Sequence, residues 1–282
     1  ACIDGVSGKQ FVKVNKFIAD GNYMCKITIS NESKNNLRKS AGDYIRNYQA
    51  SNTGKNLLRP PLLCFADADS ERFVEITKIV DGHILPHDIL STAKTVISIF
   101  LPISAMAAAD NENGLLGSKE WLEAFDLLEP LNGQFAQFIA SEIIAEGYDA
   151  AVPSAELIGN YLSGTAKWSQ RHVAWAAGLG TFGINNMLIT RSGCVGRLYS
   201  LVTSAKYCPD DIPNIEYCAY RRNGTCEICI DHCPPHAFTV NRSKISFDSA
   251  ACMAHCSRIS PGICGKCMVG LPCTLTAPGI EE

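Results

Sequence analysis

Cysteine side chains dominate the last third of the sequence. Ten of the fourteen cysteines lie between Tyr207 and Thr274, and several follow one another at C-x2-C or C-x3-C spacing. Thiolates are the ligands that soft metals and iron–sulfur clusters prefer. Cysteines two residues apart can also reach neighbouring corners of one metal centre while the backbone turns around it. The spacing therefore predicts metal binding in this part of the chain.

The order of these cysteines is typical of two cubane clusters. A C-x2-C-x3-C-P motif ends at Pro234, and a second C-x2-C with a later cysteine follows it, which is the layout of a two-cluster bacterial ferredoxin. In that layout the last cysteine of each half binds the other cluster. We predict two 4Fe-4S clusters, the first held by Cys218, Cys226, Cys229 and Cys273 (the first set), the second by Cys233, Cys252, Cys264 and Cys267 (the second set).

Other ligand choices and other interpretations of these cysteines stay open. Cys256 competes with Cys252 for one place in the second set, and Cys208 is left outside both sets. A zinc ribbon would pair two C-x2-C knuckles about 15–20 residues apart, whereas the gap from Cys229 to Cys264 is much longer. A disulfide framework would need an oxidising compartment. Zinc would leave Cys218, Cys233 and Cys273 unused, and nothing else in the sequence supports an oxidising compartment, so we expect iron–sulfur clusters.

Length and composition indicate an ordinary globular chain. With 282 residues, 46% hydrophobic and 19% charged, two domains with a sizeable core are expected. The net charge of −3 argues against nucleic acid as a partner. The most apolar run, 95–109, is short for a membrane span and contains Pro102, so no membrane partner is expected. Clustered thiols without a visible targeting segment indicate a reducing, cytoplasmic location.

The residues before the cysteine block alternate between helical and extended patterns. Pro130 is expected to separate a helix capped by Ser118 from a second helix. The alternation predicts an α/β (α+β) domain over 1–205, followed by a small ferredoxin-like domain over 206–282. Besides the helix that Ser118 caps, the patterns predict helices over 36–48, 131–146 and 170–177, and strands over 62–66 and 95–101.

A glycine-rich segment lies near the end of the first predicted domain. Gly178 to Gly183 fits the dinucleotide pattern G-x-G-x-x-G, but it follows a predicted helix instead of a strand, and Leu198 stands where an acidic residue would contact ribose. We therefore expect no nicotinamide cofactor here. A hairpin of strands 187–190 and 197–203 is expected after it. The glycines either let the backbone approach a ligand closely or form a tight connection.

Several stretches together resemble a known superfamily. AAGLGTFGINNMLIT at 176–190, VGRLYSLVTS at 195–204, the C-x2-C-x3-C-P block and the ending GICGKCMVGLPC are similar to the epoxyqueuosine reductase superfamily, whose relatives include the corrinoid-dependent reductive dehalogenases. The match covers roughly residues 90–280. It implies a nitroreductase-like domain that binds a corrinoid (cobalamin), and a ferredoxin-like domain that delivers electrons to the cobalt.

The resemblance also implies roles for individual residues. Asp248, placed at D-x3-C before Cys252, favours that cysteine over Cys256 as a ligand. In the family the glycine segment lies near the corrinoid. The implied cofactor-binding residues are Gly178, Gly180, Thr181, Phe182, Gly183 and Asn185.

Two departures separate this sequence from the tRNA-modifying members. Pro153 stands where those enzymes place a catalytic aspartate, which leaves the proton donor unknown, with Asp149, Glu156 and Tyr161 as candidates. The helical-repeat extension of many tRNA-modifying members does not follow Cys273. Both departures argue against epoxyqueuosine reduction.

Three functional hypotheses follow. The leading one is a reductase that takes electrons from a ferredoxin or flavodoxin, and passes them through two clusters to a corrinoid or another small redox cofactor that reduces a small-molecule substrate. The second is an electron-transfer or cofactor-handling protein without catalysis. The third is a tRNA epoxyqueuosine reductase with a relocated proton donor.

Overall fold

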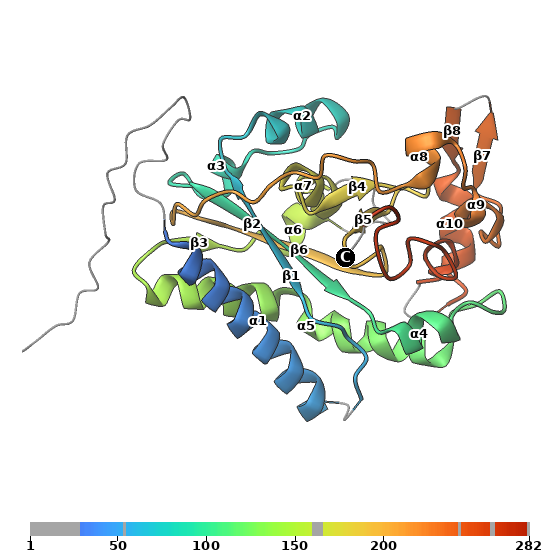
Figure 1. Ribbon diagram of the computed structural model, residues 1–282, viewed down its shortest axis with the longest axis horizontal. Helices are drawn as coiled ribbons and strands as arrows, with labels where there is room; N and C mark the ends of the chain where they lie inside the picture. The colour runs from blue at the N-terminus through green and yellow to red at the C-terminus, as the bar shows by residue number, and fades with distance from the viewer. Residues whose placement is uncertain (1–28, 53–54, 160–165, 242–243, 260–262, 281–282) are drawn as a thin grey trace, which may run out of the picture.

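A four-stranded antiparallel sheet, in the order β1-β2-β6-β3, forms the centre of the α/β part (Figure 1). The computed structural model describes residues 29–52, 55–159, 166–241, 244–259 and 263–280. Because its neighbouring strands are antiparallel, the sheet is of the α+β kind within the mixed α/β class that the sequence predicted. The strands are β1 (Leu62–Asp67), β2 (Thr95–Pro102), β3 (Ala150–Ala151) and β6 (Gly196–Thr203).

The strand β2 is central because its residues are buried on both faces. Ile97 and Ile99 point into the core that contains the long helices α1 and α5. Val96 and Phe100 point the other way, into the cores beneath the shorter helices. A continuous apolar run fits a strand covered on both sides, so the strands predicted over 62–66 and 95–101 are confirmed.

Helices cover both faces of the sheet (Figure 1). α1 (Asn31–Asn52) and α5 (Lys119–Ala145) lie on one face and pack against each other. α4 (Ala105–Asp110) follows β2 and packs against α5. The other face carries α2 (Glu71–Ile79), α3 (Pro86–Ile89), α6 (Ala155–Ile158) and α7 (Gln170–Ala176). Within these described ranges, no helix combines the length and apolar character needed to cross a lipid bilayer.

The helix α5 is one helix where the sequence predicted two. Pro130 lies inside it, although a proline removes one helical hydrogen bond and costs roughly 3 kcal/mol. Leu127, Leu131 and Phe135, on both sides of the proline, are buried in one core. Continuous burial of this face offsets the local cost. The predicted cap is confirmed, since the Ser118 side chain accepts a hydrogen bond from the N–H of Trp121.

The strands that follow the glycine segment pair differently from the prediction. β4 (Gly180–Phe182) forms the hairpin with β5 (Leu188–Thr190), and β6 instead enters the central sheet between β2 and β3. A turn does bring Thr190 to Gly193 between the two predicted strands, but it connects two different sheets. The reason is burial: the last five residues of β6 are buried, and pairing with β2 encloses them in the sheet.

The cysteine-rich part lies at one end of the sheet (Figure 1). The main hydrophobic core continues into it, since that core includes Cys218, Cys229 and Leu271 as well as residues of α1 and α5. Its elements are short: α8 (Ala219–Asn223), α9 (Ile228–Asp231), β7 (Phe238–Asn241), β8 (Lys244–Phe247), α10 (Ser249–Cys256) and the 3-10 helix η1 (Lys266–Met268).

Candidate metal centre

The four cysteines of the first set line one cavity. Cys218 directly precedes α8, Cys226 lies just before α9 and Cys229 on it, and Cys273 lies in the loop after η1. Three separate segments thus bring four thiols to one place. The remaining wall residues are mostly apolar: Gly183, Ile184, Asn185, Ile189, Ala219, Leu271, Pro272 and Pro278.

These thiols are crowded and poorly hydrated. Cys218 and Cys229 are buried. Burial raises the pKa of the Cys229 thiol, and the neighbouring thiols of Cys273, Cys267 and Cys218 raise it further. Thiolates placed together in a buried site need a compensating positive charge, which bound iron supplies when it displaces the thiol protons. The donor set and its surroundings therefore fit a cubane cluster.

The second set forms a group of five thiols. Cys233, Cys252, Cys264 and Cys267 interact electrostatically with one another or with Cys256. Cys252 and Cys256 lie four residues apart on α10, hence on one face of the helix, and their side chains are hydrogen-bonded. The backbone of Cys264 also donates to the Cys256 sulfur. Within the described residues, no group of three or more His, Cys, Asp or Glu side chains is placed to hold a single metal ion.

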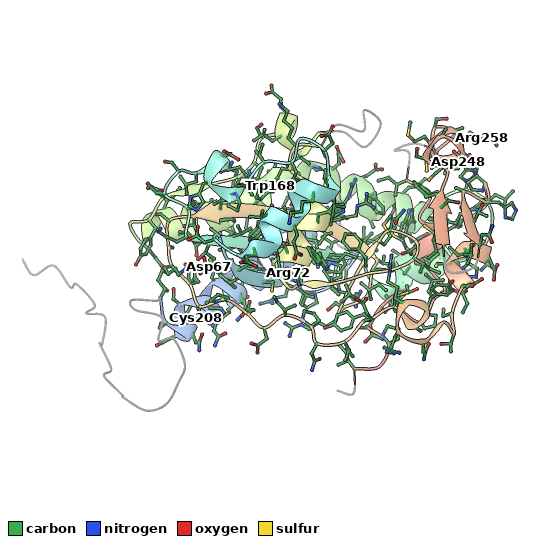
Figure 2. All side chains as sticks on the ribbon, turned by 90° about the horizontal axis from the view of Figure 1, so that it is seen from above. Asp67, Arg72, Trp168, Cys208, Asp248 and Arg258 are labelled. Atoms are coloured by element: carbon green, nitrogen blue, oxygen red, sulfur yellow. The ribbon has the colours of Figure 1, made fainter. Side chains whose placement is uncertain are left out.

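Cys208 lies away from both sets. Its carbonyl accepts a hydrogen bond from the ammonium of Lys34 on α1 (2.9 Å). Figure 2 shows Cys208 at the end of the molecule opposite to Asp248 and Arg258, which mark the cysteine-rich end. Asp248 itself caps α10, because its side chain accepts a hydrogen bond from the N–H of Ala251 (2.9 Å).

The glycine segment joins the α/β part to the cysteine-rich part. The Thr181 hydroxyl accepts a hydrogen bond from the N–H of Tyr217 (2.8 Å). The Asn185 amide donates to the carbonyl of Cys267 (2.6 Å), and Asn185 is almost fully buried. Asn185 also lines the first-set cavity. It therefore lies next to the first set and is hydrogen-bonded to a cysteine of the second. Sequence reasoning placed this residue at a cofactor, and the structure places it at the cysteines.

The glycines themselves serve close packing. A Cβ on Gly180 would lie 2.1 Å from the carbonyl oxygen of Ile189 in the paired strand, which only glycine tolerates. Gly178 has a φ of +87° and packs against the backbone at 211–212. Gly183 lines the first-set cavity. The Phe182 ring contacts the ring of His172 at 5.1 Å between centroids.

The candidate proton donors are not gathered at the cysteines. Asp149 lies at the end of β6, where its N–H donates to the Ser204 hydroxyl (2.9 Å) and its carboxylate accepts from Thr92 (3.4 Å). β6 starts beside the cysteine-rich part, and a strand of eight residues rises roughly 20 Å. Asp149, at the other end of this strand, is therefore remote from the cysteines. Glu156 is exposed on α6. Tyr161 lies outside the described residues.

Two features of the site have no signal in the sequence. Cys194, which is 3% exposed, donates its N–H to the carbonyl of Cys273 (3.0 Å), and the two side chains are hydrogen-bonded. The corner between α4 and α5 anchors the loop of the second set: Trp121 donates its indole N–H to Ile263 (3.0 Å), and a Cβ on Gly265 would lie 2.0 Å from the Trp121 ring. Both contacts join residues far apart in the sequence.

Comparisons with solved structures identify the fold. No protein-family model and no curated protein matches the sequence. A catabolic reductive dehalogenase, NpRdhA, matches with a TM-score of 0.51 at 13% identity, over 77% of this chain and 30% of that one. The fold is similar to that of a reductive dehalogenase. Epoxyqueuosine reductase from Streptococcus thermophilus matches with a TM-score of 0.48 at 16% identity, over 88% of this chain and 69% of that one.

A further match is an epoxyqueuosine reductase solved with an epoxyqueuosine-modified tRNA stem loop, with a TM-score of 0.42 at 19% identity. It covers 79% of this chain, and this chain spans 58% of the length of that reductase. Epoxyqueuosine reductases and a reductive dehalogenase, the proteins that the sequence motifs resemble, both occur among the similar structures. At these identities the likeness shows a shared mixed α/β fold.

Proposed function

We propose that this chain is an iron–sulfur redox protein, a reductase in which residues 206–282 hold two 4Fe-4S clusters and residues 1–205 hold a second cofactor. One observation carries this proposal: the four cysteines of the first set, which come from three separate segments, line a single cavity. Neither packing nor a single zinc ion needs the ten thiols found from Cys208 to Cys273, whereas two clusters use eight of them.

The placement of the two sets suits electron relay. The thiols of Cys229 in the first set and Cys267 in the second interact with each other, and only five residues separate Cys267 from Cys273. Each bound cluster would exchange single electrons, which would come from a ferredoxin or flavodoxin. A corrinoid or another small redox cofactor in the α/β part would supply the chemistry with a small-molecule substrate. Asn185 holds the α/β part against the carbonyl of Cys267.

An electron-transfer or cofactor-handling protein without catalysis is the second candidate. The glycine segment favours it, because Gly178 and Gly180 pack against protein backbone at distances that leave no room for a ligand between them. In this alternative the glycine segment packs the α/β part against the cysteine-rich part, and the clusters deliver electrons to a partner protein.

Metal and corrinoid content separate these candidates. The protein would be purified without oxygen, reconstituted with iron and sulfide, and incubated with cobalamin before gel filtration. About eight irons per chain with a co-eluting corrinoid absorption band supports the reductase. The same iron content without corrinoid supports the electron carrier. Four or fewer irons, or stoichiometric zinc, would overturn both.

The competition between Cys252 and Cys256 gives a matched pair of variants. We expect Cys252→Ala to lose about half of the iron, one cluster of two, and Cys256→Ala to retain it. Cys252 interacts with Cys233 and Cys267 of the second set, and Cys256 receives hydrogen bonds from Cys252 and the backbone of Cys264. Iron and sulfide assays on both variants decide the assignment. Loss from Cys256→Ala with retention in Cys252→Ala would exchange the two roles.

A further inference from the structure

Lys266 is a buried cation on the loop that carries two cysteines of the second set. It lies between Cys264 and Cys267, at the start of η1, and is 3% exposed. Its ammonium donates to the carbonyls of Asn111 (2.7 Å) and Asn113 (2.6 Å), and to the side-chain oxygen of Asn111 (3.2 Å). An ammonium group has three donors, and here neutral oxygens accept from it. Hydrogen bonding is therefore satisfied while the charge is not neutralised.

No carboxylate of the described residues lies at ion-pair distance from Lys266. Asp110 is close enough to influence it but is exposed to solvent. A buried charge without a counter-ion costs several kcal/mol, so a chain that keeps one must place an anion near it. Cys264 and Cys267 of the second set flank Lys266 in the sequence, and Cys264 interacts with it electrostatically.

The cation is held in a fixed position. Asn111 accepts from Lys266 and from the N–H of Ser118 (3.0 Å), and its amide donates to the carbonyl of Cys264 (3.0 Å). One asparagine side chain thus joins the ammonium to the loop that carries a second-set cysteine. The cavity of the first set has no lysine or arginine among its wall residues in the described part of the chain.

We propose that Lys266 is the counter-ion of the second cluster and raises its reduction potential above that of the first. The inference rests on the proposed function. A 4Fe-4S cluster with four thiolates is anionic, and reduction adds one electron from the ferredoxin or flavodoxin donor, so the reduced form carries one more negative charge. A fixed cation stabilises the more negative state. The position of the charge therefore favours electron entry at the second set.

The test is a redox titration of both clusters, followed by electron paramagnetic resonance, on the reconstituted full chain. Lys266→Gln removes the charge and keeps an amide donor for the Asn111 and Asn113 carbonyls. We expect the reduction equilibrium constant of the second cluster to fall about tenfold, which is about 59 mV for a one-electron couple. The first cluster should stay unchanged. The matched control is Lys39→Gln, because Lys39 is an exposed lysine on α1. This variant should shift neither potential.

A second variant covers loss of the cluster in Lys266→Gln. Asn111→Asp places a carboxylate beside the retained ammonium, and the same downward shift is expected. Recovery of the wild-type potential in Lys266→Arg would also support the role of the charge. Two clusters whose potentials respond to neither Lys266→Gln nor Asn111→Asp would overturn the inference and leave the proposed function standing. A wild-type chain that assembles fewer than two clusters would overturn the proposed function itself.

Discussion

Cys229→Ala is expected to remove the first cluster and lower the iron content from about eight to about four atoms per chain. Cys229 lies on α9, is 8% exposed and lines the first-set cavity together with the other three cysteines of its set. Alanine supplies no thiolate, and a cubane with three protein ligands in a mostly apolar cavity has no replacement among the wall residues. Assays of iron and acid-labile sulfide per chain measure the loss.

Cys64→Ala is the matched control for this variant. Cys64 is also buried, its thiol donates to the carbonyl of Ala177 in the α/β part (3.0 Å), and it belongs to neither cysteine set. The same atoms are removed from a buried position, so the effect on packing is similar and the iron content should remain complete. Full iron in Cys229→Ala would contradict the first set. Equal losses in both variants would show that packing, and not ligation, controls iron content.

Cysteine spacing as a predictor of ligands has a limit that is visible at one helix. Spacing assigned the first set, and the structure brings its four members to one cavity. It could not rank Cys252 against Cys256, because residues four apart on α10 point to the same side and are equivalent to any argument from sequence. Only contacts with the rest of the chain distinguish them.

The fold shows the same division between local and distant causes. The strand over 95–101 was predictable because each of its residues is apolar or small, and a strand covered on both faces needs that pattern. Pro130 misled the prediction because its local cost is smaller than the burial that keeps α5 continuous. The β4–β5 hairpin was missed because the partners of β6 lie far away in sequence, in β2 and β3.

The role of Lys266 could not be predicted from the sequence for a related reason. Its charge is significant only because it is buried, and the oxygens that hold it belong to Asn111 and Asn113, more than 150 positions away. Nothing in the G-K-C stretch indicates burial, since lysine is usually exposed. Features of a site that depend on which distant loop covers it therefore require the structure.

Asp210→Asn is expected to destabilise the fold by roughly 3 kcal/mol. Asp210 lies in the segment that runs from β6 to the cysteine-rich part. Its carboxylate accepts hydrogen bonds from Lys34, from Arg38 (2.8 Å) and from the N–H of Phe65 (2.9 Å). Lys34 is 4% exposed. Asparagine keeps the shape but leaves the Lys34 ammonium buried without its anion, which is the costly way to break such a pair.

The pH dependence of stability should change as well. Burial alone raises the Asp210 pKa, but hydrogen bonds from Lys34, the Phe65 N–H and Arg38 outweigh it and lower the pKa overall. A carboxyl with a lower pKa in the folded chain adds stability above its unfolded pKa of about 3.9, and this is lost as the pH falls through the folded value. The stability difference between wild type and Asp210→Asn should therefore be constant above about pH 5 and shrink below about pH 4.

Urea unfolding from pH 7 to pH 3 measures this difference, with Asp43→Asn as the control. Asp43 pairs with Arg46 on the exposed side of α1, where an ion pair contributes at most about 1 kcal/mol. An Asp210→Asn effect as small as that of Asp43→Asn would show that Lys34 does not depend on this carboxylate. The Asp210 ion pair also matters for the metal centre. The segment that contains Asp210 continues to Cys218, so its position determines where this first-set cysteine lies. Loosening it should therefore lower iron retention together with stability.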